Sequence, residues 1–451
     1  MSVYGELFRR VLFPAWDRGV RRRPTLERLR WLEETEWRPW PEIAAQQSAD
    51  LRALLRHAVA EVPYYREAFA GIRVDEIGSA DLARLPLLTR DAARDHWQAR
   101  ISSGGAAIMK STSGTTGQPL RFGYDRGSED WRQAVKLRGY AWAGYHLGAR
   151  SLHYWGGAAG PRAGWKTRAK ISLDRALRRE RYADCTRRSD EDLLGVVKII
   201  RDWRPDVLVA YTQAAVDLAK FVVSRGLRDW DDLPVLCCAE RLFPVDREVL
   251  RRAFGDGVFE TYGCREVMLI GSECAAHDGL HLSAENLIVE VVVRDGGSER
   301  PALPGELGEV VMTDLHNFGM PFIRYVNGDL AVQGSGAACA CGRTLPRIAS
   351  VEGRSTETLH DAAGNRVSGL VFNLIMVPLA ERVRQFQAVQ HRDRSITLKL
   401  VPNAQTLDAG ALSTLTAHVE KYLPGLLVRT EVVAEIAASA AGKRAVVVVE
   451  T

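Results

Sequence analysis

Residues 111–119 read Ser-Thr-Ser-Gly-Thr-Thr-Gly-Gln-Pro, and this stretch is the strongest local indication of the fold. Glycines let a backbone approach an anion closely, and successive amide groups form a nest for phosphate oxygens. The interleaved hydroxyls add donors and can help to hold a metal ion. The spacing of a Walker A loop is absent. Taken alone, a loop of this composition is more often a surface turn, so its meaning depends on the surrounding chain.

The hydrophobic pattern differs on the two sides of this loop. Residues 1–100 have a helical pattern, in which apolar residues at helical spacing end at Pro63. After Lys110, short apolar runs alternate with helical patterns, which predicts a parallel α/β sheet. These runs are 206–211 (DVLVAY), 233–239 (LPVLCCA) and 257–261 (GVFET).

Two later regions have a different pattern. The runs 287–293 (LIVEVVV) and 308–313 (GEVVMT) flank a polar turn and are expected to pair antiparallel. After Gly353 the pattern predicts a hairpin, a helix and two further strands, at 383–390 with 395–401, 409–422, 427–436 and 445–450. We therefore expect an α/β fold with two domains. Residues 1–352 form a large domain with mixed and parallel sheets and a helical opening, and residues 353–451 a small, mobile α+β domain.

Composition limits the function. A chain of 451 residues, 46% hydrophobic, predicts a globular protein of two domains, and the net charge of +5 suits anionic small molecules. The basic stretch 9–30 is read first as a solvated helix face and second as a docking surface for an acidic partner. No signal peptide or membrane span is expected, and seven cysteines, an odd number, favour a reducing cytoplasm. The absence of a basic patch interleaved with aromatic residues argues against nucleic-acid binding.

Four downstream motifs decide how the loop is interpreted. They are 262–266 (YGCRE), 322–329 (FIRYVNGD), 353–354 (GR) and 442–443 (GK). Together with STSGTTGQP, and in this order, they resemble the motifs of the adenylate-forming superfamily of acyl-CoA synthetases. The closest likeness within it is the phenylacetate–CoA ligase-like branch, whose helical opening the segment 56–69 also resembles. The resemblance spans essentially the whole chain.

The resemblance implies ATP-dependent activation of a small carboxylic acid to its acyl-adenylate, followed by thioester formation with CoA. Attack of a carboxylate on the α-phosphate brings two anions together, so a metal ion and cations are required. By resemblance Glu266 would bind Mg²⁺, with Thr115 or Thr116 nearby, and oxygen ligands suit this hard cation. Lys443 would bridge the carboxylate and the α-phosphate. The expected catalytic residues are Lys443, Glu266 and Thr116.

The resemblance also implies a nucleotide site. Asp329 would accept hydrogen bonds from the ribose hydroxyls, Tyr262 would pack against adenine, and Glu240 would lie at the purine edge. Arg324 and Arg343 are candidates for phosphate or carboxylate contacts, and for Arg343 a structural ion pair is equally open. The full expected set is Ser111, Ser113, Gly114, Thr115, Thr116, Gly117, Glu240, Thr261, Tyr262, Gly263, Asp329 and Arg343.

The acid is the least readable part of the function. The residues expected around it are Tyr154, Trp155, Gly156, Tyr211, Thr212 and Arg265, with Gln213 beside them. Aromatic and glycine residues suit a flat aryl ring, and hydroxyls could contact a ring substituent. Ordinary core packing explains the aromatic cluster equally well, and a short aliphatic acid stays open.

A cysteine and histidine set predicts a zinc site. Cys274 and His281 are followed much later by Cys339 and Cys341, and three thiolates with one imidazole suit tetrahedral Zn²⁺. Four protein ligands would make the site structural rather than catalytic. His277 competes as the fourth ligand. A matching pattern in relatives of the branch favours His281, and unrelated buried cysteines are the alternative.

Three positions depart from the family pattern. Gln118 stands where the phosphate loop commonly has lysine, and Cys264-Arg265 replaces the small residues usual before Glu266. After Gly353-Arg354, where the resemblance places a hinge, Glu357 is the only acidic residue of a usual acidic pair. These departures leave adenylation as the prediction and bear mainly on the choice of substrate.

Three functions are therefore weighed. The first is an AMP-forming acid–thiol ligase that releases acyl-CoA. The second is an adenylating enzyme that loads the acyl group onto an acyl carrier protein or an amine, for which the basic stretch 9–30 would suit an acidic carrier. The third is a non-catalytic nucleotide-binding homologue, against which Glu266, Asp329 and Lys443 speak. A homodimer stays open.

Overall fold

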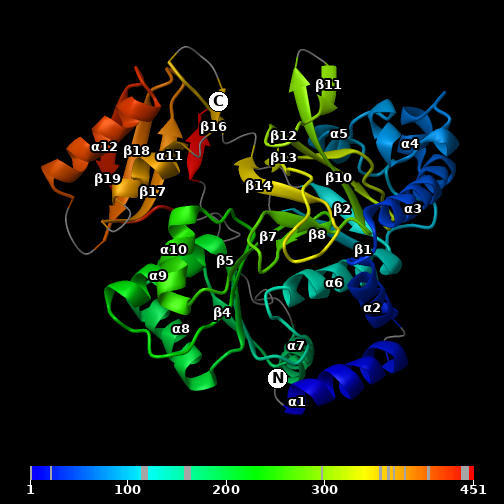
Figure 1. Cartoon of the computed structure of the whole chain (residues 1–451), viewed down its shortest axis with the longest axis horizontal. Coiled ribbons are helices and arrows are strands. Elements are labelled where there is room, and N and C mark those ends of the chain that lie inside the picture. Colours follow the sequence, from blue (N-terminus) through cyan, green and yellow to red (C-terminus); the bar gives the residue numbers. More distant parts are fainter. Residues whose placement is uncertain are drawn as a thin grey trace.

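The chain forms one long mixed sheet and a smaller sheet beside it (Figure 1). The computed structural model describes residues 3–20, 23–112, 120–156, 164–295, 298–354, 358–362, 366–368, 371–379, 382–403, 407–437 and 446–450. No helix among these residues is long and apolar enough to cross a lipid bilayer.

The large sheet has a parallel half. Its strands lie in the spatial order β4-β3-β5-β6-β7, and every neighbouring pair in this half is parallel. They are β3 (Ser151–Trp155), β4 (Glu180–Asp184), β5 (Val207–Tyr211), β6 (Val235–Cys238) and β7 (Val258–Cys264). The predicted parallel strands at 206–211, 233–239 and 257–261 are thus confirmed as β5, β6 and β7.

The other half of the sheet is antiparallel and continues from β7. Its strands are β8 (Met268–Glu273), β9 (Leu280–Leu282), β10 (Leu287–Asp295), β11 (Ser298–Pro301), β12 (Leu307–Asp314), β13 (Tyr325–Gln333) and β14 (Arg347–Arg354). The predicted antiparallel pairing of 287–293 with 308–313 is confirmed as β10 and β12. The polar stretch between them was expected to be only a turn, and this was wrong: it contains β11, which pairs antiparallel with β10.

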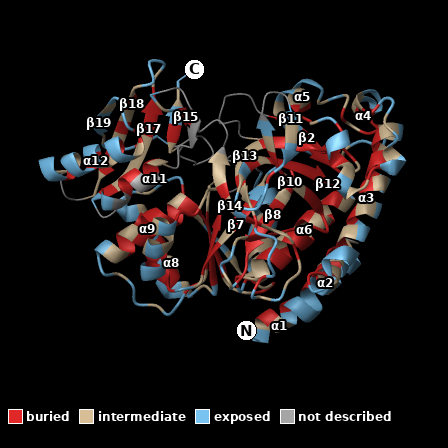
Figure 2. Cartoon of the chain, turned by 45° about the horizontal axis from the view of Figure 1, so that its top comes forward, coloured by how far each residue is buried: buried red, intermediate tan, exposed pale blue. Residues whose placement is uncertain are grey.

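Helices cover the sheet. The helices of the α/β part are α6 (Arg126–Ala141), α7 (Trp165–Arg178), α8 (Asp190–Trp203), α9 (Thr212–Ser224) and α10 (Pro244–Phe254). A hydrophobic core lies between α8, α9, α10 and the parallel strands because these helices turn apolar stripes toward them. In Figure 2 the strands of the large sheet are coloured as buried along most of their length.

The expected helical opening is confirmed. It comprises α1 (Val3–Leu7), η1 (Phe8–Leu12), η2 (Ala15–Val20), α2 (Thr25–Thr35), α3 (Trp40–Glu61), α4 (Pro63–Ala68), η3 (Val74–Glu76), η4 (Ser79–Arg84) and α5 (Arg90–Asp95). Leu51, Leu54, Leu55 and Ala58 of α3 are buried, and Pro63 begins the next helix, as the periodicity indicates. The short strands β1 (Ile108–Ser111) and β2 (Arg121–Tyr124) then pair antiparallel on either side of the phosphate loop.

The C-terminal part builds its own hydrophobic cluster, whose buried members run from Leu359 to Val447. Its elements are β15 (Thr358–His360), β16 (Arg366–Ser368), α11 (Val371–Met376), η6 (Val377–Leu379), β17 (Val383–Gln390), β18 (Ile396–Pro402), α12 (Ala409–Tyr422), β19 (Val428–Val432) and β20 (Val447–Val449). The predicted hairpin is β17 with β18. The domain boundary near Gly353 stays a prediction; that residue lies in β14 and pairs with Leu330 of the large sheet.

Candidate active site

Several predicted site residues lie where the parallel strands end. Strands β3, β5, β6 and β7 run in the same direction, so their carboxyl ends share one edge of the sheet. Trp155, Tyr211 and Tyr262 lie at or near the ends of β3, β5 and β7, and Glu240 follows β6. Ligands of open α/β sheets bind outside this edge. The structure therefore gathers residues from distant parts of the chain where a nucleotide and an acid would bind.

The aromatic residues expected around the acid belong to the core of the parallel half or pack against it. The rings of Trp155 and Tyr211 lie 4.3 Å apart between centroids and are tilted by 37°. Tyr154 is 0% exposed within the core of the parallel half, which is the core packing that the sequence left open. Burial raises the pKa of Tyr211 to about 12, so its phenol is neutral at pH 7. Trp155 is only partly buried, so among these three rings it is the one that an aryl group could contact directly.

Glu240 joins the ends of β5 and β6. The hydroxyl of Thr212 donates to the carbonyl oxygen of Glu240 at 2.8 Å, and the amide of Gln213 donates to the Glu240 carboxylate at 3.0 Å. Both donors belong to the first turn of α9, where a carboxylate is favoured by the helix dipole. The loop after β6 is thus fixed against the start of α9.

Tyr262, Asn327 and Asp329 form a hydrogen-bonded cluster. The Tyr262 hydroxyl donates to Asp329 Oδ2 at 2.8 Å, and the side-chain amide of Asn327 donates to the same oxygen at 2.5 Å. Asn327 also donates to the Tyr262 hydroxyl at 2.9 Å, and Tyr262 is buried. The two residues of the nucleotide prediction thus lie together although they come from β7 and β13. Asn327, inside the FIRYVNGD motif, was not predicted.

Glu266 lies in a second cluster, in the turn between β7 and β8. Its carboxylate pairs with Arg90 at 3.3 Å and accepts a hydrogen bond from the Tyr325 hydroxyl at 3.3 Å. Arg90 also donates to the hydroxyl of Thr112, the second residue of the STSGTTGQP stretch, at 3.1 Å. Arg90 therefore joins Glu266 to the start of that loop. Nothing in the sequence singled out this arginine among the 61 basic residues of the chain.

A buried arginine holds the turn that carries Glu266. Arg132 of α6 is 2% exposed and donates to the carbonyl oxygens of Glu266 and Arg265, each at 2.6 Å. The Arg265 side chain is exposed, and its expected contact with an acid stays a prediction. Arg132, which the sequence did not indicate as a site residue, thus fixes the backbone of the YGCRE motif.

Gly263 is required by close packing in the same motif. A Cβ atom at this position would lie 2.2 Å from the carbonyl oxygen of Met268 in β8. Thr261, two residues earlier, is buried and donates to the carbonyl oxygen of Cys237 at 3.0 Å. Both predicted residues therefore shape β7 and its pairing.

Replacing Gly263 with alanine is expected to destabilise the protein by about 1–3 kcal/mol, because β7 and β8 must separate to admit the methyl group. Chemical denaturation of the two proteins measures this difference. Gly195→Ala on α8 is the control, since a Cβ atom there meets nothing within 4 Å. Equal loss of stability in both variants would contradict the packing argument.

The two arginines proposed for phosphate contacts have structural partners. Arg324 is 1% exposed and pairs with Glu290 at 3.1 Å and Glu299 at 2.6 Å. The prediction of a phosphate contact for Arg324 is therefore wrong, because its guanidinium is buried and already paired with two glutamates. Arg343 pairs with Glu36 at 2.9 Å and lies over the rings of Trp37 and Trp142 at 4.7 Å. This is the structural ion pair that the sequence left open for Arg343.

Other predicted residues lie outside the described chain. These are Ser113, Gly114, Thr115, Thr116 and Gly117 of the phosphate loop, Lys443 of the terminal motif, and Glu357 after the hinge motif. Ser111 ends β1 and pairs with Arg121 of β2. Gly156 is the last described residue before the gap that follows β3.

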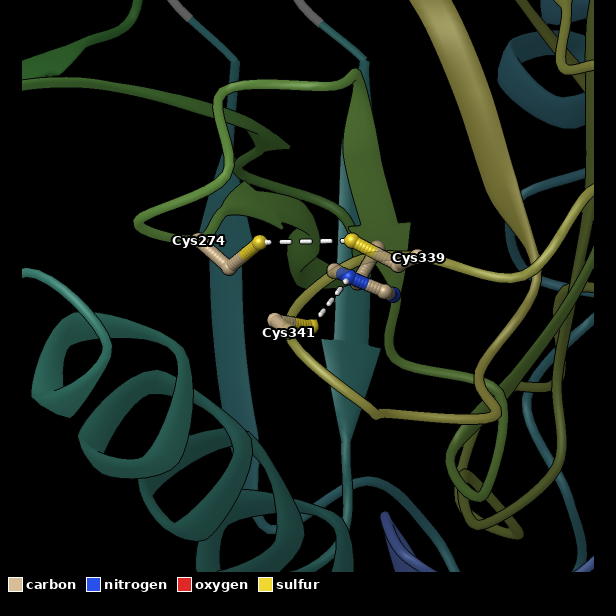
Figure 3. Close-up of side chains that lie close together, drawn as sticks. Cys274, Cys339 and Cys341 are labelled. Carbon is tan, nitrogen blue, oxygen red and sulfur yellow. Dashed lines mark hydrogen bonds between the residues drawn. The ribbon is translucent and has the colours of Figure 1, made fainter.

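The predicted metal ligands come together. The ligand atoms of Cys274, His281, Cys339 and Cys341 lie within 4.8 Å of one another. The sulfur atoms of Cys274 and Cys339 are 3.7 Å apart, and Cys341 Sγ is 3.3 Å from His281 Nε2. Figure 3 shows the three labelled cysteines directing their sulfur atoms toward one another. Tetrahedral bonds of about 2.3 Å would place neighbouring sulfur atoms about 3.8 Å apart, so the set fits Zn²⁺.

The histidine of this cluster is oriented for metal binding. His281 Nδ1 lies 3.2 Å from the carbonyl oxygen of Leu345, an acceptor that directs Nε2 toward the cysteines. Burial lowers the pKa of His281 to about 4, so the ring is neutral at pH 7, as a ligand must be. His277 lies outside the cluster and contacts Arg247 at 3.3 Å and Glu273 at 3.3 Å. The geometry therefore selects His281 as the fourth member.

Known proteins share this fold and this sequence pattern. The chain is 27% identical over 380 residues to a phenylacetate–coenzyme A ligase of Thermus thermophilus, covering 80% of this chain and 81% of the relative. It is 27% identical over 348 residues to a phenylacetate–coenzyme A ligase of Escherichia coli, covering 70% and 72%. No family model matches the chain.

Solved structures agree on the fold. A 2-hydroxyisobutyryl-CoA ligase in the postadenylation state has a TM-score of 0.74 at 18% identity, covering 93% of this chain and 92% of that one. An anthranilate CoA ligase has a TM-score of 0.53 at 17% identity, covering 74% and 65%. The fold is that of the adenylate-forming CoA ligases. In sequence, the chain is similar to the phenylacetate–coenzyme A ligases at 27% identity.

Proposed function

We propose that this protein is an AMP-forming acid–thiol ligase. It activates a small carboxylic acid with ATP and passes the acyl group to CoA. One observation supports the proposal: Tyr262 of β7 is hydrogen-bonded to Asp329 of β13 although these strands are not neighbours in the sheet, and Glu266, in the turn after β7, pairs with Arg90. Homology to ligases that act on phenylacetate and CoA supports this chemistry.

In the proposed mechanism, the nucleotide is held by the carboxyl edge of the sheet. The Asp329 carboxylate accepts the ribose hydroxyls, and hydrogen bonds from Tyr262 and Asn327 fix its position. The ring of Tyr262 packs against adenine, and Glu240 lies at the purine edge. The backbone amides of residues 113–117 would cradle the phosphates, as the sequence predicts.

Glu266 would hold Mg²⁺ together with a hydroxyl of Thr115 or Thr116. The ion, when bound, neutralises charge on the phosphates during attack. A carboxylate fits this role, and Glu266 is fixed for it by Arg132 through the backbone and by Tyr325 through its hydroxyl. Arg90 places a second cation between Glu266 and the phosphate loop. A carboxylate oxygen of the acid then attacks the α-phosphorus, the bond from this phosphorus to the β-phosphate breaks and pyrophosphate leaves, while Lys443 stabilises the charge that develops.

Among small acids we propose an aryl or arylacetic acid. Trp155, at the end of β3 and packed against Tyr211, offers a partly exposed apolar ring that suits an aryl group. Relatives named for phenylacetate make this acid the first probe. In the second step the CoA thiol attacks the acyl carbonyl and AMP leaves.

CoA is favoured over a carrier protein as the acceptor. A carrier was expected to use the basic stretch 9–30. Two arginines of this stretch, Arg23 and Arg28, instead form ion pairs with Asp130 within the protein, at 3.7 Å and 3.9 Å. Arg28 also lies over the ring of Trp131. Less of this stretch is therefore available to an acidic protein than its sequence indicates.

We also propose that the four-residue cluster holds a structural Zn²⁺. When bound, the ion would join the loop after β8, β9 and the segment before β14 into one unit. Reduced thiolates are needed for this, which a cytoplasmic location supplies.

Metal analysis tests the zinc proposal. The purified chain is expected to contain about one zinc per chain, and Cys339→Ser is expected to lose the metal and to unfold at a lower temperature. Cys185→Ser is the control, because Cys185 is equally buried but lies in the core of the parallel half. Full zinc content in Cys339→Ser would contradict the site.

Pyrophosphate release tests the function. ATP, Mg²⁺ and a panel of arylacetic, aryl and short-chain acids are supplied with and without CoA. Release that depends on both an acid and the enzyme, with a CoA thioester as product, is the expected result. Release without a thioester would move the acceptor to a carrier or an amine. Absence of release with every acid, alongside measurable ATP binding, would favour the non-catalytic homologue.

A further inference from the structure

Helix α7 turns an apolar face toward solvent at the edge of the large sheet. It connects β3 to the edge strand β4. Trp165, Leu173 and Leu177 are 70%, 62% and 47% exposed, and Ala169 and Ala176 are exposed as well. At 3.6 residues per turn these five residues share an arc of about 120°. Amphipathic helices of globular proteins normally bury such a stripe, so this one is available to a partner.

Basic residues flank the apolar arc, and by helical periodicity Lys166 falls within it, between the positions of Leu173 and Leu177. Arg168 and Arg175 follow it on one side by helical periodicity, and Lys170 on the other; Arg168 and Lys170 are exposed. Asp174 is the only acidic residue in the sequence of α7, and it pairs with Arg178 at 3.2 Å. The outward apolar face is therefore bordered by net positive charge.

The N-terminal helices extend this surface. The Tyr4 hydroxyl donates to the carbonyl oxygen of Leu177 at 2.7 Å, so α1 contacts the end of α7, and Figure 1 shows both near the N-terminus. Val3, Leu7 and Val11 of α1 and η1 are 89%, 47% and 53% exposed. Arg9 and Arg10 accompany them, with side chains 42% and 73% exposed; both pair with Glu6, at 3.1 Å and 2.7 Å, so these two arginines and Glu6 together carry a net charge of about +1.

We propose that α7, with α1 and η1 beside it, is a docking surface for anionic phospholipid membranes. Exposed Trp and Leu bordered by Lys and Arg is the composition of helices that lie in the plane of a membrane interface. Trp165, Leu173 and Leu177 enter the boundary between head groups and acyl chains, and Arg168 and Lys170 contact lipid phosphates.

Other occupants explain less. A symmetric contact with a second copy would bring the basic flanks of two α7 helices together, and like charges oppose that. A bilayer accepts apolar side chains from α7 and from the N-terminal helices without a shaped counterpart. It therefore accounts for the apolar residues of both segments at once.

Vesicle sedimentation with the full chain tests the proposal. Binding is expected to vesicles of phosphatidylcholine mixed with phosphatidylglycerol, but not to phosphatidylcholine alone, and to weaken with added salt. The double variants Trp165→Ser/Leu173→Ser and Arg168→Glu/Lys170→Glu are each expected to lower the affinity by about tenfold or more. Leu303→Ser, which changes a leucine 65% exposed outside these helices, is the control and is expected to bind as the parent does.

Thermal unfolding of each variant establishes that the fold is intact, as expected for changes of exposed side chains. Failure of the parent to bind phosphatidylglycerol vesicles would overturn the proposal, as would unchanged binding by either double variant. A concentration-dependent dimer that Leu173→Ser dissociates would instead assign the surface to a second copy. Vesicle binding requires no turnover, so its outcome is independent of whether the ligase proposal holds.

Discussion

Replacing Glu266 with glutamine is expected to lower acid-dependent pyrophosphate release by about two to three orders of magnitude. Glutamine keeps the size of the side chain and can still accept from the Tyr325 hydroxyl, which lies 3.3 Å from the carboxylate. It removes the charge that Mg²⁺ needs, and it leaves Arg90 without its acidic partner. The effect should therefore fall on turnover and on the Mg²⁺ concentration required, rather than on folding.

A matched variant separates the catalytic effect from the cost of breaking an ion pair. Glu273 is also buried, and it pairs with Arg247 at 2.8 Å, on the strand that follows the Glu266 turn. Glu273→Gln is expected to lower the free energy of unfolding but to release pyrophosphate at the parent's rate when folded. An equal loss of release in both variants, or an unchanged magnesium requirement in Glu266→Gln, would remove Glu266 from its proposed role.

Replacing Lys443 with alanine is expected to lower adenylation by at least about two orders of magnitude, because the cation that stabilises charge between carboxylate and α-phosphate is lost. If the lysine serves the first step only, thioester formation from a supplied acyl-adenylate should continue. Measuring both half-reactions on the same preparation gives this contrast.

Lys421→Ala is the control for Lys443. Lys421 belongs to α12 in the same C-terminal part, and its ammonium lies over the ring of Tyr422. Its removal is expected to leave both half-reactions unchanged. Unchanged pyrophosphate release by Lys443→Ala, or equal losses in the two half-reactions, would contradict the assignment of Lys443.

Much of the fold could be predicted because its signals are local. The apolar runs that became β5, β6 and β7 are short and bounded, and the helix predicted at 409–422 is observed as Ala409–Tyr422. The Cys/His set was also predictable, since few other residues bind zinc and their number in the chain is small. Strand β11 was missed because its sequence, SERP, is polar and it lies at the edge of the sheet, where only one neighbouring strand contacts it.

The site was only partly predictable because its supporting contacts join residues far apart in the chain. Arg90 reaches Glu266 and Arg132 reaches the same turn, and neither arginine has a sequence pattern that distinguishes it from many others. The family resemblance made Arg343 a candidate for phosphate or carboxylate contacts and left a structural ion pair equally open, because its partner Glu36 lies 307 residues away in the sequence. The motifs predict which residues contact the ligand, and contacts between distant parts of the chain determine which residues hold them in place.

The transfer of one carboxylate oxygen to AMP tests the central claim most directly. Phenylacetic acid labelled with oxygen-18 in its carboxylate is incubated with the protein, ATP, Mg²⁺ and CoA, and the phosphorus-containing products are analysed by mass spectrometry. An acyl-adenylate requires one carboxylate oxygen to bond to the α-phosphorus and to stay there when the thiol displaces AMP. We predict one labelled oxygen in AMP and none in pyrophosphate. Label in inorganic phosphate with ADP as the nucleotide product, or thioester formation with unlabelled AMP, would contradict adenylation.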